Sequence, residues 1–273
     1  MNFPAFRHEA MATAWQITVA GQAPRYAQQA ATAAWRELDR LESELSRYIE
    51  SSDIARVNRL AEGEATIVGE AAFECLRLAA EMQALTRGAF DATYASEPRG
   101  HGAATPQRFD LDPAAHTVIS RTSRLHVDLG AIGKGFALDR LAGVLREWDV
   151  TSACLHSGGS TALAVGAPPG ALGWPVGLGD DPGAQSIALV SAALSGSGTA
   201  VKGEHIVDPR AGGTGARRER VWSLAPQAAV ADALSTAFFV FADTEIAAFC
   251  AAHPEFGAAV ARGESLTRHG ALA

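Results

Sequence analysis

Three short segments of the chain place side chains that could hold a phosphate group and a divalent cation beside backbone turns. They are HVDLGAIGKGFALDR from His126 to Arg140, HIVDPRAG from His205 to Gly212, and ADALSTA from Ala231 to Ala237. Together they supply carboxylates, a lysine, a histidine and a hydroxyl. Phosphoryl and nucleotidyl transfer need such groups, because a metal ion offsets pyrophosphate charge and a base removes a hydroxyl proton.

The first segment has the composition of a turn that leads from a strand into a helix. Glycines at 130, 133 and 135 allow a tight turn whose exposed N–H groups would favour an anion, and Lys134 adds a positive charge. Asp128, at the end of the expected strand, could bond a hydroxyl or amide edge of a ligand. The spacing is GxxGxG, however, and not the GxGxxG of a dinucleotide-binding turn. Taken by itself, the segment also fits a plain strand–turn–helix joint with Lys134 in water.

The second segment contains the candidate catalytic residues. His205 titrates near neutral pH and could serve as a general base. The dipeptide Asp208-Pro209 indicates a fixed turn, because the residue before a proline is held extended. The Asp208 carboxylate could orient His205, or it could hold only its own turn. A half-exposed strand histidine without a catalytic role fits the same residues.

The third segment places Asp232 and Thr236 four residues apart in an expected helix, and therefore on one face. One oxygen from each, with a backbone carbonyl from elsewhere, would make part of a Mg²⁺ coordination shell. The same two residues also fit the chemistry of a helix start. There an aspartate is favoured by the helix dipole, and a threonine can bond back to the preceding turn.

Other catalytic motifs are absent from the sequence. It has no GxxxxGK[ST], which excludes a P-loop, and neither HExxH nor a CxxC pair, which argues against zinc. It has no GxSxG, and the SGGS around Ser157 lacks the pattern of a nucleophile elbow. The hypothesis that remains is a metal- and phosphate-binding site built without these motifs.

The elements that must position these residues follow from hydrophobic periodicity and from glycine and proline punctuation. Strands and helices mix without a regular βαβ alternation, so we predict an α+β fold with mixed sheets and flanking helices. The expected helices are Pro24–Tyr48, Gly69–Leu85, Gly133–Trp148 and Ala228–Phe241. The expected strands are Met11–Ala20, Arg108–Leu111, Thr117–Ser120, Leu125–Asp128, Trp174–Leu178, Ser186–Leu194 and Arg220–Ala225, with a turn at Gly158–Gly159 between two more.

Composition and charge narrow the class of protein. The 273 residues are 48% apolar and 19% charged, an ordinary globular balance with enough chain for one large domain or two small lobes. The formal charge of −7 argues against a nucleic-acid partner, which would need a basic face. No apolar run reaches transmembrane length, so membrane insertion is not expected.

Cysteine usage bears on the compartment. Cys75, Cys154 and Cys250 are odd in number and have no CxxC spacing, which indicates free thiols in a reducing environment. The N-terminus lacks the pattern of a secretory signal. We therefore expect a cytoplasmic protein, with a periplasmic location left open if the N-terminus is trimmed. The oligomeric state stays open.

The order of motifs from about Met11 to Phe241 resembles the ApbE family, the FAD:protein FMN transferases. HVDLGAIGKGFALDR is similar to the family's D-L-G-[GA]-I-[AG]-K-G almost letter for letter, and VWSLAPQAAVADALSTAFFV to its A-D-A-L-[ST]-T ending. MATAW, with Ala12 in place of glycine, LSRYIESSDIARVN, TRGAFDATY, LHSGGSTALAVG, ALSGSG and HIVDPRAGG resemble further family motifs. The chain departs from the family in a shorter segment between Ser197 and His205, in Ser160 where Asp or Asn is common, and in Ala211 where Thr or Ser follows DPx.

The resemblance implies a single ApbE-like domain over residues 1–273, with two lobes and an active site in a cleft between them. It implies FAD as substrate, Mg²⁺ as cofactor, and transfer of the FMN half to a serine or threonine hydroxyl of a target flavoprotein, with release of AMP. The acceptor would carry a D-x-x-[ST]-G-A-[ST]-like pattern. The alternatives are an FAD pyrophosphatase that yields FMN and AMP, and a non-catalytic FAD-binding protein.

By the same resemblance, the family's site residues correspond to residues of this chain. The metal ligands would be Asp232, Thr236 and the backbone carbonyl of Ala131. His205 would lie beside the pyrophosphate as the candidate base, with Asp208 as its possible orienting group. The FAD site would be lined by Met11, Tyr48, Ala89, Phe90, Asp91, Asp128 and Lys134, together with His205.

Overall fold

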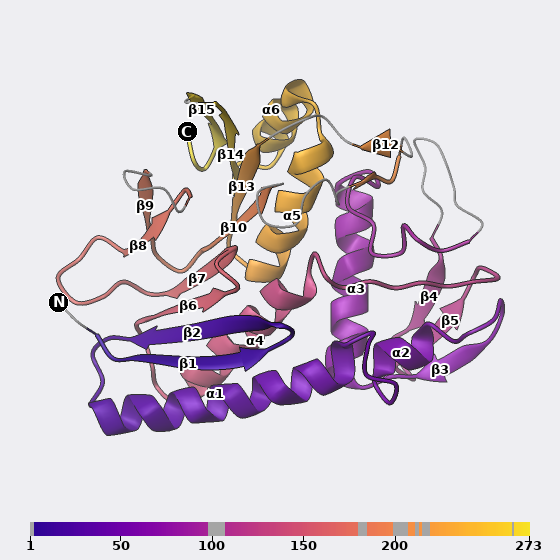
Figure 1. Ribbon diagram of the computed structural model, residues 1–273, viewed down its shortest axis with the longest axis horizontal. Helices are drawn as coiled ribbons and strands as arrows, with labels where there is room; N and C mark the ends of the chain where they lie inside the picture. Colours follow the sequence, from indigo (N-terminus) through magenta and orange to yellow (C-terminus); the bar gives the residue numbers. More distant parts are fainter. Residues whose placement is uncertain are drawn as a thin grey trace.

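An eight-stranded antiparallel sheet is the largest element of the protein, which we describe from a computed structural model (Figure 1). The structure describes residues 3–97, 107–179, 185–198, 207–210, 213–214, 219–263 and 265–273. In spatial order the strands are β1 (Ala5–Ala10), β2 (Thr13–Val19), β6 (Ala153–Ser157), β7 (Thr161–Val165), β10 (Ala193–Gly198), β13 (Arg220–Ala225), β14 (Gly257–Arg262) and β15 (Ser265–Gly270). This antiparallel sheet with its helices confirms the predicted α+β class.

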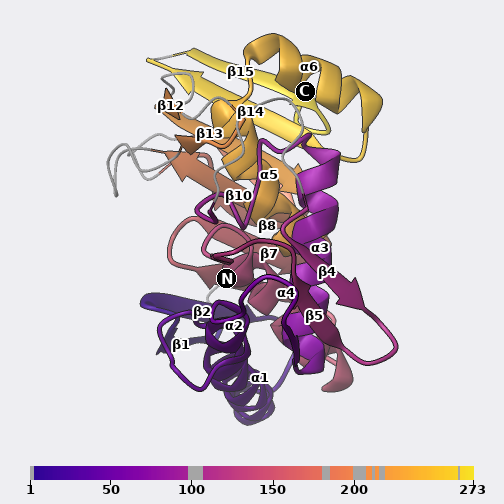
Figure 2. The same ribbon diagram turned by 90° about the vertical axis from the view of Figure 1, so that its right-hand side faces the viewer.

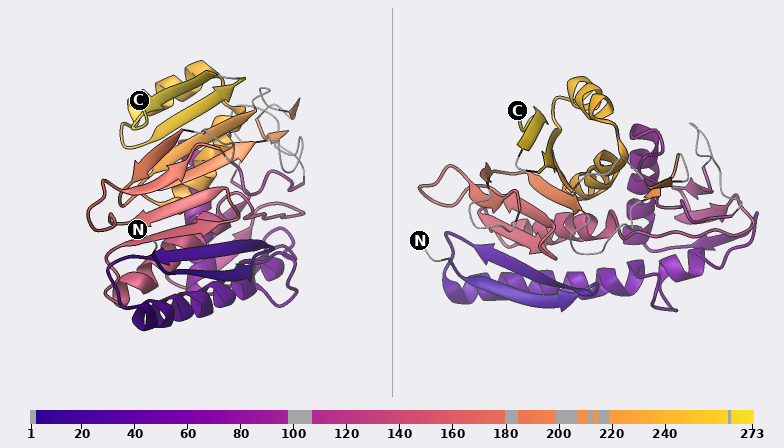
Figure 3. Two further views of the ribbon diagram at one scale, coloured as in Figure 1. Left: turned by 60° about the vertical axis from the view of Figure 1, so that its left-hand side comes forward. Right: turned by 45° about the horizontal axis from the view of Figure 1, so that its top comes forward.

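Both faces of the large sheet are covered. On one face lie the helices α1 (Pro24–Leu45), α4 (Gly133–Glu147) and α5 (Ala228–Val240), which share a hydrophobic cluster with Trp15, Leu155 and Leu163 of the sheet (Figures 1 and 3). On the other face lies the hairpin of β8 (Trp174–Gly177) and β9 (Ser186–Leu189), which packs with Leu194 and Trp222. Because alternate residues of a strand point to opposite faces, the central strands are apolar on both.

A second group of elements stands beside the helical layer. It comprises α2 (Asp53–Val57), α3 (Glu70–Leu85) and a three-stranded sheet of β3 (Ala65–Ile67), β5 (Thr117–Ser120) and β4 (Phe109–Asp112) (Figure 2). Phe73 of α3 stacks on His116, in the turn between β4 and β5. The remaining elements are α6 (Asp243–Ala252) and the short hairpin of β11 (Val207–Asp208) and β12 (Gly213–Thr214). None of the helices in the described ranges is both long and apolar enough to span a membrane.

The long helix α1 follows the predicted apolar stripe. The stripe residues are all buried, namely Ala27, Ala31, Ala34, Leu38, Leu41 and Leu45. Pro24 occupies the first turn, where its missing N–H costs nothing. The helix ends at Leu45 rather than at the predicted Tyr48, so Tyr48 belongs to the turn that follows and is 82% exposed.

The predicted strand Leu125–Asp128 is wrong. No described strand runs through this segment, because side chains satisfy its backbone groups in place of a β-ladder. The Asn58 amide donates to the Val127 carbonyl at 3.0 Å and accepts from the Val127 N–H at 2.6 Å. The Ser96 hydroxyl accepts from the His126 N–H at 2.9 Å. Such long-range side-chain contacts leave no periodic signal in the sequence.

The prediction of one strand over Ser186–Leu194 is also wrong. The chain turns at Ser191, whose φ is +46°, and the two halves enter different sheets as β9 and β10. A continuous apolar run cannot by itself show such a break. Elements that were not predicted are the strands β1, β3 and β12, the C-terminal hairpin β14–β15, and the helices α2 and α6.

The turn between β1 and β2 is strained. Met11 and Ala12 form its two central positions, with φ of +50° and +56°, a region that side chains with a Cβ disfavour. The Met11 N–H donates to Glu42 Oε1 of α1 at 2.7 Å, which holds the turn against the helix. Ala12 is the position at which the resemblance to the family motif leads us to expect glycine.

We therefore expect Ala12→Gly to raise the free energy of unfolding by about 1 kcal/mol, since glycine adopts a positive φ without a steric penalty. Urea unfolding followed by circular dichroism measures the change. Ala14→Gly is the matched control. Ala14 is also exposed but lies in β2, so there glycine should lower stability by about 0.5–1 kcal/mol. Equal changes at the two positions would contradict the strain at residue 12.

Candidate active site

Two segments far apart in the sequence meet at Asp232. Asp232 lies in the second turn of α5 and is only 5% exposed. Its Oδ2 accepts a hydrogen bond at 3.2 Å from the N–H of Gly135, in the first turn of α4. Lys134 Nζ lies 3.6 Å from the same oxygen. The first and third predicted segments therefore form one site.

The Lys134 ammonium connects this carboxylate to the turn before α4. Its Nζ donates to the carbonyl oxygen of Gly130 at 2.8 Å, while it also faces Asp232. Ala131 is the next residue of that turn. Thr236 lies one helical turn beyond Asp232, with its Oγ1 3.5 Å from the Asp232 carbonyl oxygen. The structure thus brings the turn of Ala131 next to Asp232, and the ligand assignment itself stays a prediction.

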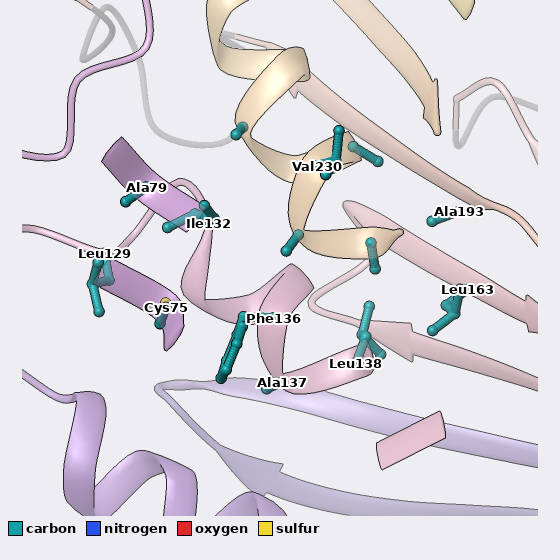
Figure 4. Packing of buried hydrophobic residues seen from close by; sticks show 14 of the residues in the cluster. Cys75, Ala79, Leu129, Ile132, Phe136, Ala137, Leu138, Leu163, Ala193 and Val230 are labelled. Atoms are coloured by element: carbon teal, nitrogen blue, oxygen red, sulfur yellow. The ribbon is translucent and has the colours of Figure 1, made fainter. Parts of the chain in front are cut away.

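A glycine allows this close meeting of α4 and α5. A Cβ atom built on Gly135 would lie 2.2 Å from the carbonyl oxygen of Ala228, far inside van der Waals contact. Figure 4 shows Ile132 and Phe136, near the start of α4, in one hydrophobic cluster with Cys75 of α3 and Val230 of α5. Burial raises the pKa of the Cys75 thiol, which favours its neutral form.

The donors at this site suit a hard cation. Among the described residues, no group of three or more His, Cys, Asp or Glu gathers to hold a metal ion. The site offers instead one carboxylate, the Thr236 hydroxyl and the main-chain carbonyls of the turn before α4. Oxygen donors of this kind fit Mg²⁺, which usually keeps several waters or substrate phosphates, better than they fit zinc.

The expectation that the glycine turn presents its N–H groups to an anion is wrong for its glycines. Gly130 N–H donates to Asp128 Oδ1 at 2.9 Å, and Gly133 N–H to the Leu129 carbonyl at 2.7 Å. Gly135 N–H is bound to Asp232. The turn closes on its own residues, so Lys134 is its principal positive group.

Asp139 of α4 fixes the start of α5. Its two carboxylate oxygens accept the N–H groups of Ala228 and Ala229 at 2.8 and 2.9 Å. These N–H groups belong to the first turn of α5 and have no partner within the helix. Asp139 is therefore a helix cap supplied by a neighbouring helix, and it sets how α5 sits on α4. Burial raises the pKa of Asp139 to about 6, although the two N–H groups act in the opposite direction.

This shift predicts a pH dependence. The folded pKa of Asp139 lies above its value of 3.8 in a model peptide, so the unfolded chain releases its proton first as pH rises. This stabilising contribution is present below pH 4 and is lost between about pH 4 and pH 6, and its loss lowers the free energy of unfolding by about 3 kcal/mol. Asp139→Asn should lack this loss.

The measurement is urea unfolding of both proteins at several pH values from 4 to 7. Other carboxylates titrate in the same range, so the difference between wild type and Asp139→Asn is the relevant quantity. The variant should be less stable than wild type, because it lacks the carboxylate cap. Above pH 4, this difference in the free energy of unfolding should shrink as pH rises, because only the wild type loses stability through Asp139. Parallel stability curves for the two proteins would refute the raised pKa.

Asp128 lies in a polar cluster at the end of α1. Its Oδ2 is 3.3 Å from Arg47 Nη1, and the same Arg47 nitrogen donates to His126 Nε2 at 3.1 Å. Arg47 also donates to the Tyr48 hydroxyl at 2.6 Å and lies over the Tyr48 ring, 4.7 Å from its centroid. Two of the predicted FAD-site residues, Asp128 and Tyr48, are therefore held by one arginine that sequence reasoning missed.

The other predicted FAD-site residues differ in their surroundings. Ala89 and Phe90 are buried in the hydrophobic cluster, and Met11 packs against its edge. Asp91 Oδ1 accepts from the N–H and the hydroxyl of Thr93, both at 2.7 Å. Burial raises the pKa of Asp91. Buried Ala89 and Phe90 can shape a ligand site from behind, whereas their side chains offer it no open surface.

Of the predicted catalytic pair, His205 and Asp208, the structure describes only Asp208. His205 lies outside the described residues. Asp208 is buried, and its two oxygens accept from the Nε and Nη2 of Arg210 at 3.0 and 2.9 Å. Arg210 also donates to Glu245 of α6 at 2.9 Å. The Asp208 carboxylate thus holds its own turn and ties it to α6, and its action on His205 stays a prediction, as does a cleft between two lobes.

Sequence reasoning missed Asp139, Arg47 and the serine of β10 that contacts Asp232. Ser195 Oγ donates to Asp232 Oδ1 at 3.2 Å. Asp139 stands inside the glycine-marked segment and could have been singled out there as a charged residue among apolar ones. Its partners lie 89 and 90 positions further along the chain, however, so no local pattern identifies its role.

Comparisons with known proteins bear on the family and the fold. Over 122 residues the chain is 31% identical to an FAD:protein FMN transferase of Klebsiella pneumoniae (strain 342), a match that covers 39% of this chain and 36% of that relative, about a third of its length. The fold is similar to that of the ApbE protein of Thermotoga maritima, with a TM-score of 0.81, 25% identity, and coverage of 98% of this chain and 97% of that one. It is also similar to the flavinyl transferase ApbE of Pseudomonas stutzeri, with a TM-score of 0.81, 20% identity, and coverage of 98% and 94%. The family model described as "ApbE family" matches residues 11–260, and this chain therefore belongs to the ApbE family.

Proposed function

We propose that this protein is a Mg²⁺-dependent FAD:protein FMN transferase that moves FMN from FAD to a serine or threonine hydroxyl of a target flavoprotein and releases AMP. One observation carries the proposal. The Lys134 ammonium lies between the Gly130 carbonyl and the Asp232 carboxylate, so a basic group and metal-binding oxygens from two distant segments share one site. Family membership and the named activity of the relatives support the same reaction.

The reaction balances as a displacement at phosphorus. The acceptor hydroxyl oxygen forms a bond to the phosphorus on the flavin side of FAD. The bond from that phosphorus to the bridging oxygen breaks, and AMP leaves with that oxygen and the electron pair. The hydroxyl proton passes to a general base, for which we assign His205; such help is worth about 10²–10⁴ in rate.

The residues of the site divide the remaining work. A Mg²⁺ ion held by Asp232, Thr236 and the carbonyl of Ala131 would neutralise pyrophosphate charge and so favour departure of AMP. Lys134 places a second positive charge beside the Asp232 carboxylate. Its backbone belongs to the first turn of α4. Asp232 is oriented by donors on both of its oxygens, so it needs little rearrangement to bind a cation.

The flavin is assigned to the side of the site formed by the end of α1. The Tyr48 ring has Arg47 against it, is 82% exposed, and could stack on a planar ring system. Met11, Asp91 and Asp128 lie in the turns that we assign to the same ligand, and Ala89 with Phe90 would back it. We place all of these elements in one ApbE-like domain.

The test is a transfer assay with a defined acceptor. The protein is mixed with FAD, Mg²⁺ and a peptide that carries a D-x-x-[ST]-G-A-[ST] pattern, and mass spectrometry follows the peptide. We expect the peptide to gain one FMN in a phosphoester bond, and AMP to appear in equal amount. A peptide with alanine at both hydroxyl positions is the control and should stay unmodified.

An arm without peptide separates the rival activities. Free FMN and AMP formed at the full rate without an acceptor would identify an FAD pyrophosphatase. Bound FAD with no product under either condition would identify a non-catalytic FAD-binding protein. Each of these results would overturn the transferase assignment.

A further inference from the structure

A row of buried hydroxyl groups crosses the large sheet beneath α5. Thr161 of β7 is the registered partner of Ser195 of β10, and Ser195 is the registered partner of Ser223 of β13. Directly opposed residues of antiparallel strands project from the same face. All three side chains are buried, on the face that α5 covers. Such a row is unusual in a core, because a buried hydroxyl is costly unless it is hydrogen-bonded.

Two hydroxyl groups of this row, those of Thr161 and Ser195, face the Asp232 carboxylate. Ser195 Oγ lies 3.2 Å from Asp232 Oδ1, which is a carboxylate oxygen and can only accept. Ser195 has one proton, so it accepts at its contact with Thr161 Oγ1 at 3.0 Å, and Ser235 Oγ lies further away, at 3.4 Å. Thr161 Oγ1 also lies 3.5 Å from Asp232 Oδ1, so Thr161 faces both Ser195 and the carboxylate, and Ser195 is the nearer of its two acceptors.

A second hydroxyl pair holds the main chain of the same residue. Ser235 Oγ donates to the Asp232 carbonyl at 2.9 Å, and Ser197 Oγ lies 2.8 Å from Ser235 Oγ. Ser235 donates its only hydroxyl proton to the Asp232 carbonyl, so Ser197 is the donor in the Ser197–Ser235 pair. Ser223, in turn, donates to the carbonyl of Ala231. Three strands thus hold α5 by directional contacts around Asp232.

These contacts leave the two carboxylate oxygens with different surroundings. Oδ1 faces the sheet and receives the Ser195 hydroxyl, whereas Oδ2 faces the first turn of α4, with Gly135 and Lys134. Without the Ser195 hydroxyl, Oδ1 would keep only the longer contact with Thr161 Oγ1 at 3.5 Å, and rotation about the last bond of the Asp232 side chain would be opposed more weakly from that side.

We infer that Ser195, supported by Thr161, is a positioning residue that fixes the orientation of the Asp232 carboxylate and thereby tunes cation affinity. The inference rests on the proposed function, in which Asp232 is a metal ligand. Hydrogen-bonding partners of metal ligands set their orientation, and their loss costs about 10–100-fold in metal affinity. Ser223 and Ser235 contact only main-chain carbonyls or other hydroxyls around this residue, so they act on the packing of α5 and not on the carboxylate directly.

The test measures binding of Mn²⁺, a spectroscopic probe for Mg²⁺, by electron paramagnetic resonance, both alone and with saturating FAD. We expect Ser195→Ala to raise the Mn²⁺ dissociation constant about 10-fold, with a smaller rise in the same direction for the isosteric Thr161→Val. The double variant should bind somewhat more weakly than Ser195→Ala alone, because Thr161 Oγ1 also lies 3.5 Å from Asp232 Oδ1. In the transfer assay the Mg²⁺ concentration for half-maximal activity should rise more than kcat falls.

Two matched variants separate orientation from stability. Ser223→Ala removes a hydroxyl from the same row and should lower the melting temperature without a change in Mn²⁺ affinity. Ser157, the registered partner of Thr161 on β6, is also buried, and its hydroxyl finds no hydrogen-bond partner among the described residues. Ser157→Ala should leave both quantities unchanged or raise stability slightly, since it removes an unsatisfied polar group.

The outcomes are decisive in each case. An unchanged Mn²⁺ dissociation constant in a folded Ser195→Ala protein would overturn the inference and leave the metal site intact. If Ser195→Ala does not fold, the Thr161→Val protein is measured in its place. An unchanged Mn²⁺ dissociation constant in that protein would also overturn the inference. Equal weakening by Ser195→Ala and Ser223→Ala would show that the row acts only through packing. A wild-type protein that binds no Mn²⁺ would overturn the metal assignment and this inference together, whatever the transfer assay gives.

Discussion

Asp232→Asn is expected to lower the rate of FMN transfer by about 100-fold or more, because loss of even a partner of a metal ligand costs 10–100-fold. The substitution keeps the shape of the side chain and removes its charge. Lys134 Nζ and the Gly135 N–H both face Asp232 Oδ2, so an amide N–H₂ at that position would meet two donors. Transfer rates over a range of Mg²⁺ concentrations, with Mn²⁺ binding in parallel, measure the effect.

The control is Asp110→Asn, at a partly exposed aspartate of β4 that pairs with Arg121. It makes the same chemical change at a residue that we do not assign to the site, and it should leave transfer within about twofold, as surface ion pairs contribute little. Circular dichroism establishes that both variants are folded. Full Mg²⁺-dependent transfer by Asp232→Asn would show that this carboxylate is not a metal ligand.

Gly135→Ala is expected to destabilise the protein by about 2–3 kcal/mol, which lowers the melting temperature by about 5 °C or more. The added Cβ would lie 2.2 Å from the Ala228 carbonyl oxygen and 2.7 Å from the Ala229 Cα, both backbone atoms that cannot rotate away. To make room, α5 must move away from α4. That movement would also lengthen the hydrogen bond from the Gly135 N–H to Asp232, so transfer should fall together with stability.

Gly143→Ala in the same helix is the matched control. Gly143 lies in α4, and a Cβ built on it meets nothing within 4 Å. There alanine should raise stability by about 0.5–1 kcal/mol, because it has the higher helix propensity. Thermal unfolding followed by circular dichroism compares the two variants. A Gly135→Ala protein as stable as Gly143→Ala would mean that the two helices do not approach as closely as described.

Local sequence determined the elements whose cause is local. The apolar stripe of α1, from Ala27 to Leu45, recurs at helical spacing and is buried as predicted. The strands Thr117–Ser120 and Arg220–Ala225 have the predicted bounds, because alternation and turn residues mark both ends. The glycine-marked segment before α4 and the helix that carries Asp232 were also predicted, since their residue types are specific to turns and helix starts.

Tertiary structure decided how these pieces are used. The segment Leu125–Asp128 joins none of the described sheets, because Asn58, at the end of α2, bonds to the N–H and the carbonyl of Val127. The glycine turn was expected to offer its N–H groups to an anion, yet Gly130, Gly133 and Gly135 bond within the protein. Asn58 and Asp232, which bond to the backbone of Val127 and Gly135, both come from distant parts of the chain.

The sequence by itself determined the family to which the chain belongs and suggested the residues that we assign to the site. Only the fold decided that Asp232 receives Ser195 from the sheet and Gly135 from α4, and that Asp139 caps α5 from the neighbouring helix. The physical reason is the range of the interactions. Periodicity and turn preferences act over a few residues, whereas hydrogen bonds between buried groups form wherever packing places donors and acceptors together.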